Sequence, residues 1–311
     1  MTHQKHQQQL LAGFAVSLAG AILFSTKAIF VKLAFRDTGV DAVTLLALRM
    51  LFSLPFYIAA AWFAGRKEST DALTPRYWFW ILIMGIFGYY LSSLFDFIGL
   101  QYVSAGLERL ILFLYPTFAV LLNTWIFKAK LSGVQLVALI LTYLGIGIAY
   151  YAELATDTGS PGFYFGSLMI FLCAVTYSFY LVGTGRLVQK AGATRYTAYA
   201  MLAATVGIFI HFLVTHNARQ LVFTPALTGY SIALAIIATV IPSFLMSSGM
   251  KKIGSNNVSI ITSIGPVSTI LQAHFFLGEK ILFMQIAGTV LVIAGVLLIG
   301  WKSSQAAPVT N

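Results

Sequence analysis

Long apolar stretches alternate with short polar ones along nearly the whole chain, and they predict helices that cross a membrane. A helix needs about 20 apolar residues to span a hydrocarbon core about 30 Å thick. The runs are too long for membrane strands and lack their two-residue alternation. The segments that qualify are residues 11–33, 42–64, 77–98, 104–126, 133–152, 162–184, 196–215, 229–250, 255–277 and 281–301. We therefore expect an all-α membrane protein with ten transmembrane helices.

The composition supports this interpretation. Hydrophobic residues make up 59% of the 311 residues, and charged residues make up 9%. In a typical soluble domain about 25% of the residues are charged. The apolar run from Leu10 to Phe35 exceeds the roughly 7–15 residues of a signal-peptide core, so we expect it to be retained as the first span. Cys173 is the only cysteine and lies in an apolar run, where we expect a small buried hydrophobe.

Most of the basic residues that give the net charge of +10 lie in the predicted loops and end segments. With the N-terminus inside, three Lys or Arg residues fall in outer loops, namely Arg36, Arg219 and Lys280. Twelve fall in inner segments, namely Lys5, Arg66, Lys67, Arg76, Lys128, Lys130, Arg186, Lys190, Arg195, Lys251, Lys252 and Lys302. This bias predicts that both termini are cytoplasmic. It also explains the basic charge without a nucleic-acid partner, which we do not expect.

The chain weakly repeats itself at an offset of 150 residues. The informative identities pair Thr74-Pro75 with Thr224-Pro225, Pro116 with Pro266, Lys130 with Lys280 and Gln135 with Gln285. We expect two repeats of five helices each, over residues 1–152 and 161–302. Because five is odd, the second repeat must enter the membrane from the opposite side. Inverted repeats of this kind build many secondary transporters, with the substrate site near the midplane.

Two stretches share a further pattern. One reads GLQYVSAGLERLILFLYPTFAVLL and then KAKLSGVQLVALILTYLGIGI, and the other reads GMKKIGSNNVSIITSIGPVSTIL and then GEKILFMQIAGTVLVIAGVLL. Each resembles the second part of an EamA-type repeat of the drug/metabolite transporter superfamily, although the first copy has KAK at 128–130 where the second has GEK at 278–280. The resemblance implies ten helices, cytoplasmic termini and a central cavity built mainly from spans 1, 3, 4, 6, 8 and 9. It does not specify a substrate.

Five charged residues fall at one predicted depth, in the outer halves of the first four spans. They are Lys27, Arg49, Asp96, Glu108 and Arg109. Charges at this depth are costly unless they are paired or hydrated. They could form a buried ion-pair network that fixes the helices, or an outer gate or carboxylate-binding site. Extension of the side chain to the interface is a third alternative, chiefly for Lys32 and Glu108.

Other polar residues recur on single helix faces. The third span carries Tyr89, Ser92, Ser93 and Asp96 on one face, and the ninth carries Asn256, Ser259, Ser263 and His274. With Tyr115, these residues are candidates for substrate binding or gating, or for hydrogen bonds between helices. Gly13 and Gly20 indicate close helix packing. Pro116 and Pro266 interrupt equivalent spans and are candidate hinges.

These features favour a secondary transporter or exporter of small metabolites, such as amino acids or related organic solutes, in the cytoplasmic membrane. An integral membrane enzyme is disfavoured because the histidines are scattered and no HExxH or nucleotide-binding motif occurs. A channel-like facilitator without gradient coupling is the other alternative. We expect no cofactor or metal. A proton is a candidate coupling ion through Asp96 or Glu108, and a homodimer is a candidate assembly.

Overall fold

The computed structural model describes residues 3–67, 73–128, 133–156, 161–216 and 223–306. This part of the chain is helical and contains no strand. Eight stretches within it are long and apolar enough to cross a membrane, and Phe283–Leu298 is a shorter apolar helix. The prediction of an all-helical membrane protein is confirmed, whereas ten separate spans remain a prediction. Cys173 is a buried free thiol, as expected.

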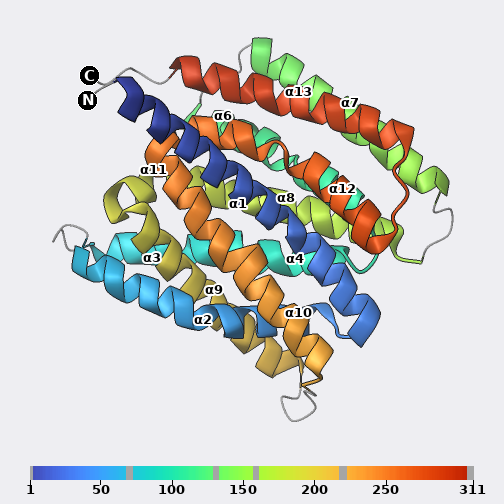
Figure 1. Cartoon of the computed structure of the whole chain (residues 1–311), viewed down its shortest axis with the longest axis horizontal. Coiled ribbons are helices and arrows are strands. Elements are labelled where there is room, and N and C mark those ends of the chain that lie inside the picture. The colour runs from blue at the N-terminus through green and yellow to red at the C-terminus, as the bar shows by residue number, and fades with distance from the viewer. Residues whose placement is uncertain (1–2, 68–72, 129–132, 157–160, 217–222, 307–311) are drawn as a thin grey trace. The chain divides into compact units, whose positions relative to one another are not determined.

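The helices of the described residues follow one another with short connections (Figure 1). They are α1 (His3–Thr38), α2 (Ala42–Lys67), α3 (Pro75–Gly85), the π-helix η1 (Ile86–Leu91), α4 (Ser92–Gly99), α5 (Ala105–Leu112), α6 (Tyr115–Phe127), α7 (Gly133–Thr156), α8 (Phe163–Ala191), α9 (Ala193–Thr215), α10 (Pro225–Ala235), the π-helix η3 (Ile236–Val240), α11 (Ile241–Thr262), α12 (Gly265–Leu277) and α13 (Phe283–Ala306).

Both candidate hinge prolines lie at helix starts. Pro116 is the second residue of α6 and Pro266 is the second residue of α12. A proline is tolerated in the first turn because its missing N–H would have no partner there. The helix is interrupted just before each proline, at residues 113–114 and 263–264. The fourth predicted span is thus divided into α5 and α6.

The boundary predicted between the eighth and ninth spans is wrong. Helix α11 continues from Ile241 to Thr262, through residues 251–254, which were expected to connect two spans. No proline removes a backbone donor in this stretch, and one glycine, Gly254, costs a helix only about 1 kcal/mol. The break comes instead before Pro266, so the range 255–277 is shared between α11 and α12.

Element bounds recur at the same offset of 150 residues. Helices α3 and α10 start at Pro75 and Pro225, and the π-helices that follow start at Ile86 and Ile236. Helices α6 and α12, and likewise α7 and α13, begin and end at equivalent positions. The break between α4 and α5 at residues 100–104 has no counterpart, because α11 is continuous there.

The chain forms two compact units, each drawn from both halves of the sequence. Unit 1 contains Met1–Ile29, Ser104–Pro161 and Ile237–Asn311. Unit 2 contains Phe30–Val103 and Gly162–Ile236. Helix α1 and the segment around η3 therefore each contribute to both units.

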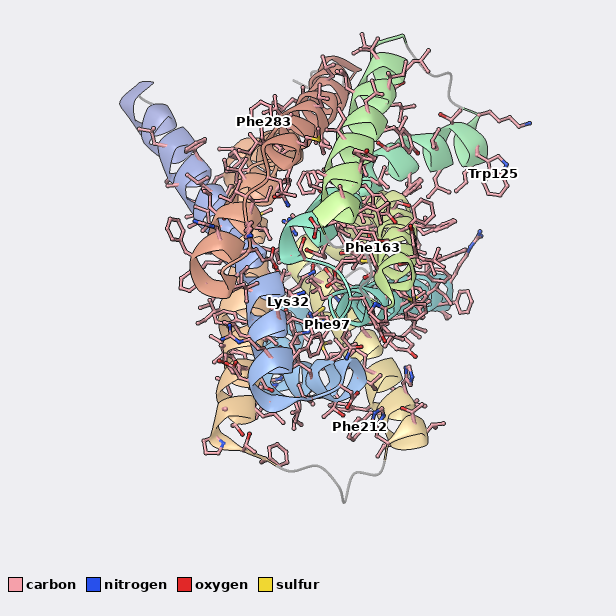
Figure 2. All side chains as sticks on the ribbon, turned by 90° about the vertical axis from the view of Figure 1, so that its right-hand side faces the viewer. Lys32, Phe97, Trp125, Phe163, Phe212 and Phe283 are labelled. Atoms are coloured by element: carbon pink, nitrogen blue, oxygen red, sulfur yellow. The ribbon has the colours of Figure 1, made fainter. Side chains whose placement is uncertain are left out.

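Close glycine contacts hold unit 1 together. Helices α7 and α13 lie side by side (Figure 1), and a Cβ atom added at Gly145 would lie 2.5 Å from the carbonyl oxygen of Gly288. Gly13 packs against Ile253 and Gly20 against Leu245, which confirms that the small residues of α1 allow close approach to another helix. Many of the exposed side chains are large and apolar, including those of Trp125 and Phe283 (Figure 2).

Unit 2 packs α2 against α9, and α3 and α4 against α8 and α9 (Figure 1). Its core around α3, α8 and α9 includes Ile81, Met84, Tyr180 and Tyr196. The ring of Tyr180 lies against Gly88 of η1, where a larger residue would clash. Aromatic side chains thus fill the space beside the π-helical turn.

Candidate functional site

The five charged candidates are buried and divide between the two units. Lys27, Glu108 and Arg109 belong to unit 1, and Arg49 and Asp96 belong to unit 2. Their exposed fractions lie between 0% and 8%. Each unit therefore contains its own charged group. Their combination in a single layer stays a prediction.

An ion pair joins α1 to α5 in unit 1. The Nζ atom of Lys27 lies 3.6 Å from Oε1 of Glu108. Glu108 is fully buried, so its side chain is not extended to the interface as one alternative proposed. All eight residues of α5 are buried. The pair therefore ties two helices through largely buried groups.

Arg109 occupies a different environment on the same helix. Its guanidinium lies 5.6 Å from the ring centre of Phe24 and 5.5 Å from that of Phe113. Its Nε atom has no hydrogen-bond partner among the described residues, and none of the ion pairs found among them involves it. Tyr115 interacts electrostatically with the same guanidinium. Adjacent positions on α5 thus hold one paired carboxylate and one cation flanked by aromatic rings.

The charged group of unit 2 is built on α2 and α4. Arg49 donates a hydrogen bond of 3.0 Å to Ser93, and its guanidinium lies 4.9 Å from the ring centre of Phe97. The Asp96 carboxylate interacts electrostatically with Arg49. The structure thus brings three of the predicted site residues together within one unit.

Tyr89 takes part in a tyrosine cluster rather than standing alone. Its hydroxyl shares a hydrogen bond of 2.8 Å with Tyr180, and the Tyr180 ring stacks on those of Tyr177 and Tyr196. The Tyr196 hydroxyl shares a hydrogen bond of 2.6 Å with Thr184. These contacts are those expected of polar groups that join helices.

The structure describes two of the four polar candidates of the ninth predicted span. His274 is exposed near the end of α12, and its Nδ1 atom lies 2.9 Å from the backbone oxygen of Glu279. Ser263 is buried at the break before α12. The side chains of Asn256 and Ser259 lie outside the described part of the structure.

Glu279 is a site residue that the sequence analysis did not identify. Its two carboxylate oxygens accept hydrogen bonds from the backbone N–H groups of Ala105 and Gly106, at 3.0 and 3.4 Å. Ser104 completes this N-terminus by accepting from Leu107 N. A carboxylate is favourable there because a helix N-terminus has free donors and a partial positive charge. The loop after α12 therefore positions α5, which carries Glu108 and Arg109.

We expect Glu279→Ala to lower stability by about 0.5–2 kcal/mol, the usual cost of a lost N-terminal cap. Glu279→Gln keeps an acceptor and should lose less, while Lys280→Ala at the exposed neighbour should leave stability unchanged. Thermal unfolding of the purified proteins in detergent measures the three effects. Equal midpoints for Glu279→Ala and Lys280→Ala would contradict the assigned cap.

Lys32 has a related role at the preceding helix end in unit 2. Its Nζ atom donates hydrogen bonds to the backbone oxygens of Leu100 and Val103, at 3.3 and 2.6 Å. These oxygens follow α4, and a cation is favourable at a helix C-terminus. The Lys32 side chain, for which extension to the interface was one alternative, holds backbone carbonyl groups at this helix end.

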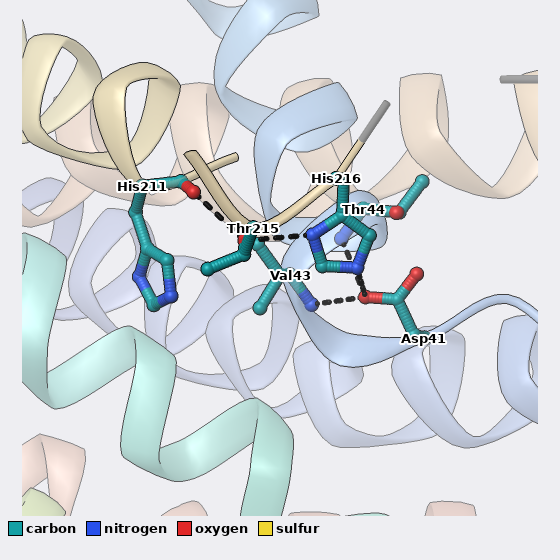
Figure 3. A network of polar contacts seen from close by, with 6 residues as sticks. All are labelled: Asp41, Val43, Thr44, His211, Thr215 and His216. Carbon is teal, nitrogen blue, oxygen red and sulfur yellow. Dashed lines mark hydrogen bonds and ion pairs between the residues drawn. The ribbon is translucent and has the colours of Figure 1, made fainter. Parts of the chain in front are cut away.

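A second polar network joins α2 and α9 in unit 2 (Figure 3). Asp41 accepts hydrogen bonds from the backbone N–H groups of Val43 and Thr44, at 2.9 and 3.0 Å, and so caps the start of α2. The Nε2 atom of His216 lies 3.1 Å from the same carboxylate. Thr215 shares a 2.8 Å hydrogen bond with Nδ1 of His216. This network lies on the predicted outer side.

The Asp41 cap should make stability depend on pH. Burial acts to raise the pKa of this carboxyl, but hydrogen bonds from Thr44 and Val43 and the nearby His216 outweigh it and lower the pKa below its ordinary value. The carboxylate therefore stabilises the fold above the unfolded-state pKa of about 3.9, and this contribution is lost as pH falls through the folded-state pKa. Asp41→Asn should remove the dependence while keeping an acceptor for the cap.

The check is the unfolding midpoint of the wild type and of Asp41→Asn, followed from neutral pH to about one unit below the unfolded-state pKa of about 3.9. Asp41→Ala should be less stable than Asp41→Asn at neutral pH by about 0.5–2 kcal/mol, because it lacks the cap altogether. An unchanged acid dependence in Asp41→Asn would assign that dependence to another group.

Comparison with known proteins agrees with the class that these features define. Buried charges on apolar, broken helices are typical of integral membrane transporters. The chain belongs to the EamA-like transporter family, which it matches over residues 11–151 and again over residues 164–301.

Relatives cover the chain almost completely. "Uncharacterized transporter YcbK" of Bacillus subtilis is 30% identical over 293 residues, with 92% of this chain and 91% of the relative covered. An "Uncharacterized transporter" of Archaeoglobus fulgidus is 24% identical over 296 residues, covering 93% and 96%. A solved crystal structure shares the fold with a TM-score of 0.67 at 18% identity, covering 94% of this chain and 98% of that one.

Proposed function

We propose that the protein is a secondary transporter that moves small metabolites, such as amino acids or related organic solutes, across the cytoplasmic membrane by alternating access. Its two halves act as inverted repeats, and both termini face the cytoplasm. The direction, whether import or export, is set by the gradients of solute and coupling ion. This proposal goes beyond family membership, which by itself specifies no substrate.

The observation that carries the proposal is the recurrence of the same architecture in each half. The family matches the chain twice, and the helix starts, the π-helices and the breaks before Pro116 and Pro266 recur 150 residues apart. Repeats with discontinuous helices are typical of transporters, because irregular backbone at membrane depth is tolerated where it lines a cavity. Pro116 and Pro266 are the candidate hinges of this movement.

The buried charges supply candidate parts of a gate. A pair such as Lys27 and Glu108 favours the state in which it forms and must be broken or hydrated in the other. Glu108 and Asp96 are also the buried carboxylates through which a proton could be coupled to transport. In this proposal the charged group of each unit responds to the state of the transporter.

Flux into liposomes tests the function directly. We would reconstitute purified full-length protein and measure uptake of radiolabelled amino acids and organic anions, with and without an imposed pH gradient. Protein-dependent, saturable flux supports a transporter, and its dependence on the pH gradient supports proton coupling. Linear, unsaturable flux of many solutes would favour a channel-like facilitator instead.

Reporter fusions at the two ends test the orientation. A reporter that is active only outside the cytoplasm should be silent at both termini, because the inner segments hold most of the loop Lys and Arg residues. Activity at either end would overturn the orientation and the depths derived from it.

A further inference from the structure

Arg109 is a buried cation whose charge the described residues do not balance. Its exposed fraction is 7%, and no carboxylate of the described chain pairs with it. The neighbouring carboxylate, Glu108, lies 3.6 Å from Lys27. The charged group of unit 1 therefore contains two cations and one anion. A buried cation is costly unless an anion and hydrogen bonds compensate it.

A second positive feature lies beside the guanidinium. Gly265 is the first residue of α12, a helix of 13 residues. A Cβ atom added at Gly265 would lie 2.6 Å from Nη2 of Arg109, so the guanidinium is placed directly against the helix N-terminus. Helix N-termini carry a partial positive charge and attract anions. A cation placed there gains nothing from the helix, whereas an anion shared by both would be stabilised twice.

Two aromatic rings lie beside the guanidinium, and the Ser25 hydroxyl donates to the Gly265 carbonyl oxygen at 3.4 Å. Phe24 of α1 and Phe113 lie at 5.6 and 5.5 Å from the guanidinium, measured to their ring centres. A guanidinium binds carboxylates through two parallel hydrogen bonds, and aromatic rings pack well against an apolar body. The excess of one positive charge matches a single carboxylate better than a dianion.

We propose that Arg109 and the N-terminus of α12 bind the carboxylate of an organic monoanion whose apolar part packs against Phe24 and Phe113. The inference rests on the proposed function in one respect, namely that this anion is the transported solute. Binding itself does not require transport, so the two can be tested separately.

Benzoate is a suitable probe because it joins one carboxylate to a flat apolar ring, and benzamide has the same shape without the charge. Isothermal titration calorimetry on the full-length protein in a neutral detergent, free of anionic lipid, should give a benzoate Kd at least about tenfold below that of benzamide. Arg109→Gln should raise the benzoate Kd at least about tenfold, a change of about 1.4 kcal/mol. Arg36→Gln, which removes an exposed arginine, should leave it unchanged.

A second variant covers the case in which Arg109→Gln fails to fold. Gly265→Ala keeps the charge but places a methyl group 2.6 Å from Nη2 of Arg109, which must shift, and Gly265 has no positive φ that would exclude alanine. It too should weaken benzoate binding at least about tenfold. Equal affinity for benzoate and benzamide, or wild-type affinity in a folded variant of either residue, overturns the proposal.

The liposome assay separates this inference from the proposed function. Benzoate binding that depends on Arg109, without flux of any anion, supports the site and contradicts transport of its ligand. Saturable flux of neutral solutes by a protein that does not bind benzoate supports the transporter and overturns the site.

Discussion

Glu108→Leu should greatly lower the yield of folded protein, because it leaves the Lys27 ammonium buried without its carboxylate. Removing one partner of a buried pair costs about 3–5 kcal/mol, much of it from the stranded charge. Lys27→Met should have a similar effect, since it strands the fully buried carboxylate. The measurement is the yield of monodisperse protein and its unfolding midpoint in detergent.

The double variant Lys27→Met with Glu108→Leu is the matched control. It removes both charges, and replacing a buried pair by apolar residues of similar volume is often neutral. It should therefore be more stable than either single variant. If the double variant loses as much stability as the two single variants added together, the residues act independently.

The same variants distinguish a structural tie from a gate. Flux per folded protein should be unchanged in the double variant if the pair only holds α1 to α5. It should fall, or lose its dependence on the imposed gradient, if the pair must form and break during transport. If both single variants fold and transport like the wild type, the pair has neither role.

Gly145→Leu should separate α7 from α13 and destabilise unit 1. Its side chain would meet the backbone of Gly288, with the carbonyl oxygen 2.5 Å from the new Cβ. Backbone atoms cannot move aside as a flexible side chain can, and overpacking a close contact costs about 1–3 kcal/mol or more. We expect a lower unfolding midpoint and a loss of yield.

Gly147→Leu is the control, two residues further along the same helix. No atom lies within 4 Å of a Cβ added there. The substitution exchanges the same two residues without the contact, and loss of a helix glycine gains about 0.5–1 kcal/mol, so the midpoint should stay the same or rise. Equal losses in the two variants would attribute the effect to leucine in α7 and not to the contact with α13.

The apolar pattern predicted the helices well because backbone hydrogen bonds must be satisfied within each span. It placed the starts of the third and eighth spans a few residues late, at 77 and 229, whereas α3 and α10 begin at Pro75 and Pro225. It failed at residues 251–254, since polar residues in a loop and on a long helix look alike in sequence. Charge alone does not end a helix.

The capping role of Glu279 could not be read from spacing, because its partner Ala105 lies 174 positions away along the chain. The GEK turn was visible as a motif, but only the fold brings it to the start of α5. Similarly, Lys27, Glu108 and Arg109 could be assigned a common depth, yet depth does not specify partners. Helix rotation decides that Glu108 meets Lys27 while Arg109 meets aromatic rings.

The third predicted span contains a π-helical turn that the sequence pattern does not reveal. Tyr89 lies in η1, and Asp96 lies in the α-helix that follows. A π-turn holds one residue more than an α-turn, so the side chains after it are rotated relative to those before it. Ser93 and Asp96, which both follow the turn, interact with Arg49, while Tyr89 bonds Tyr180.

The two π-helices also bear on how this chain arose. A π-turn is closed by a longer hydrogen-bonded ring than an α-turn, so it arises most simply when one residue is inserted into an existing helix. Here π-turns begin at Ile86 and Ile236, 150 residues apart, and in each a serine hydroxyl bonds a carbonyl of the widened turn. Two independent insertions at one register are less economical than a single insertion in an ancestral half-length gene, before it was duplicated and fused.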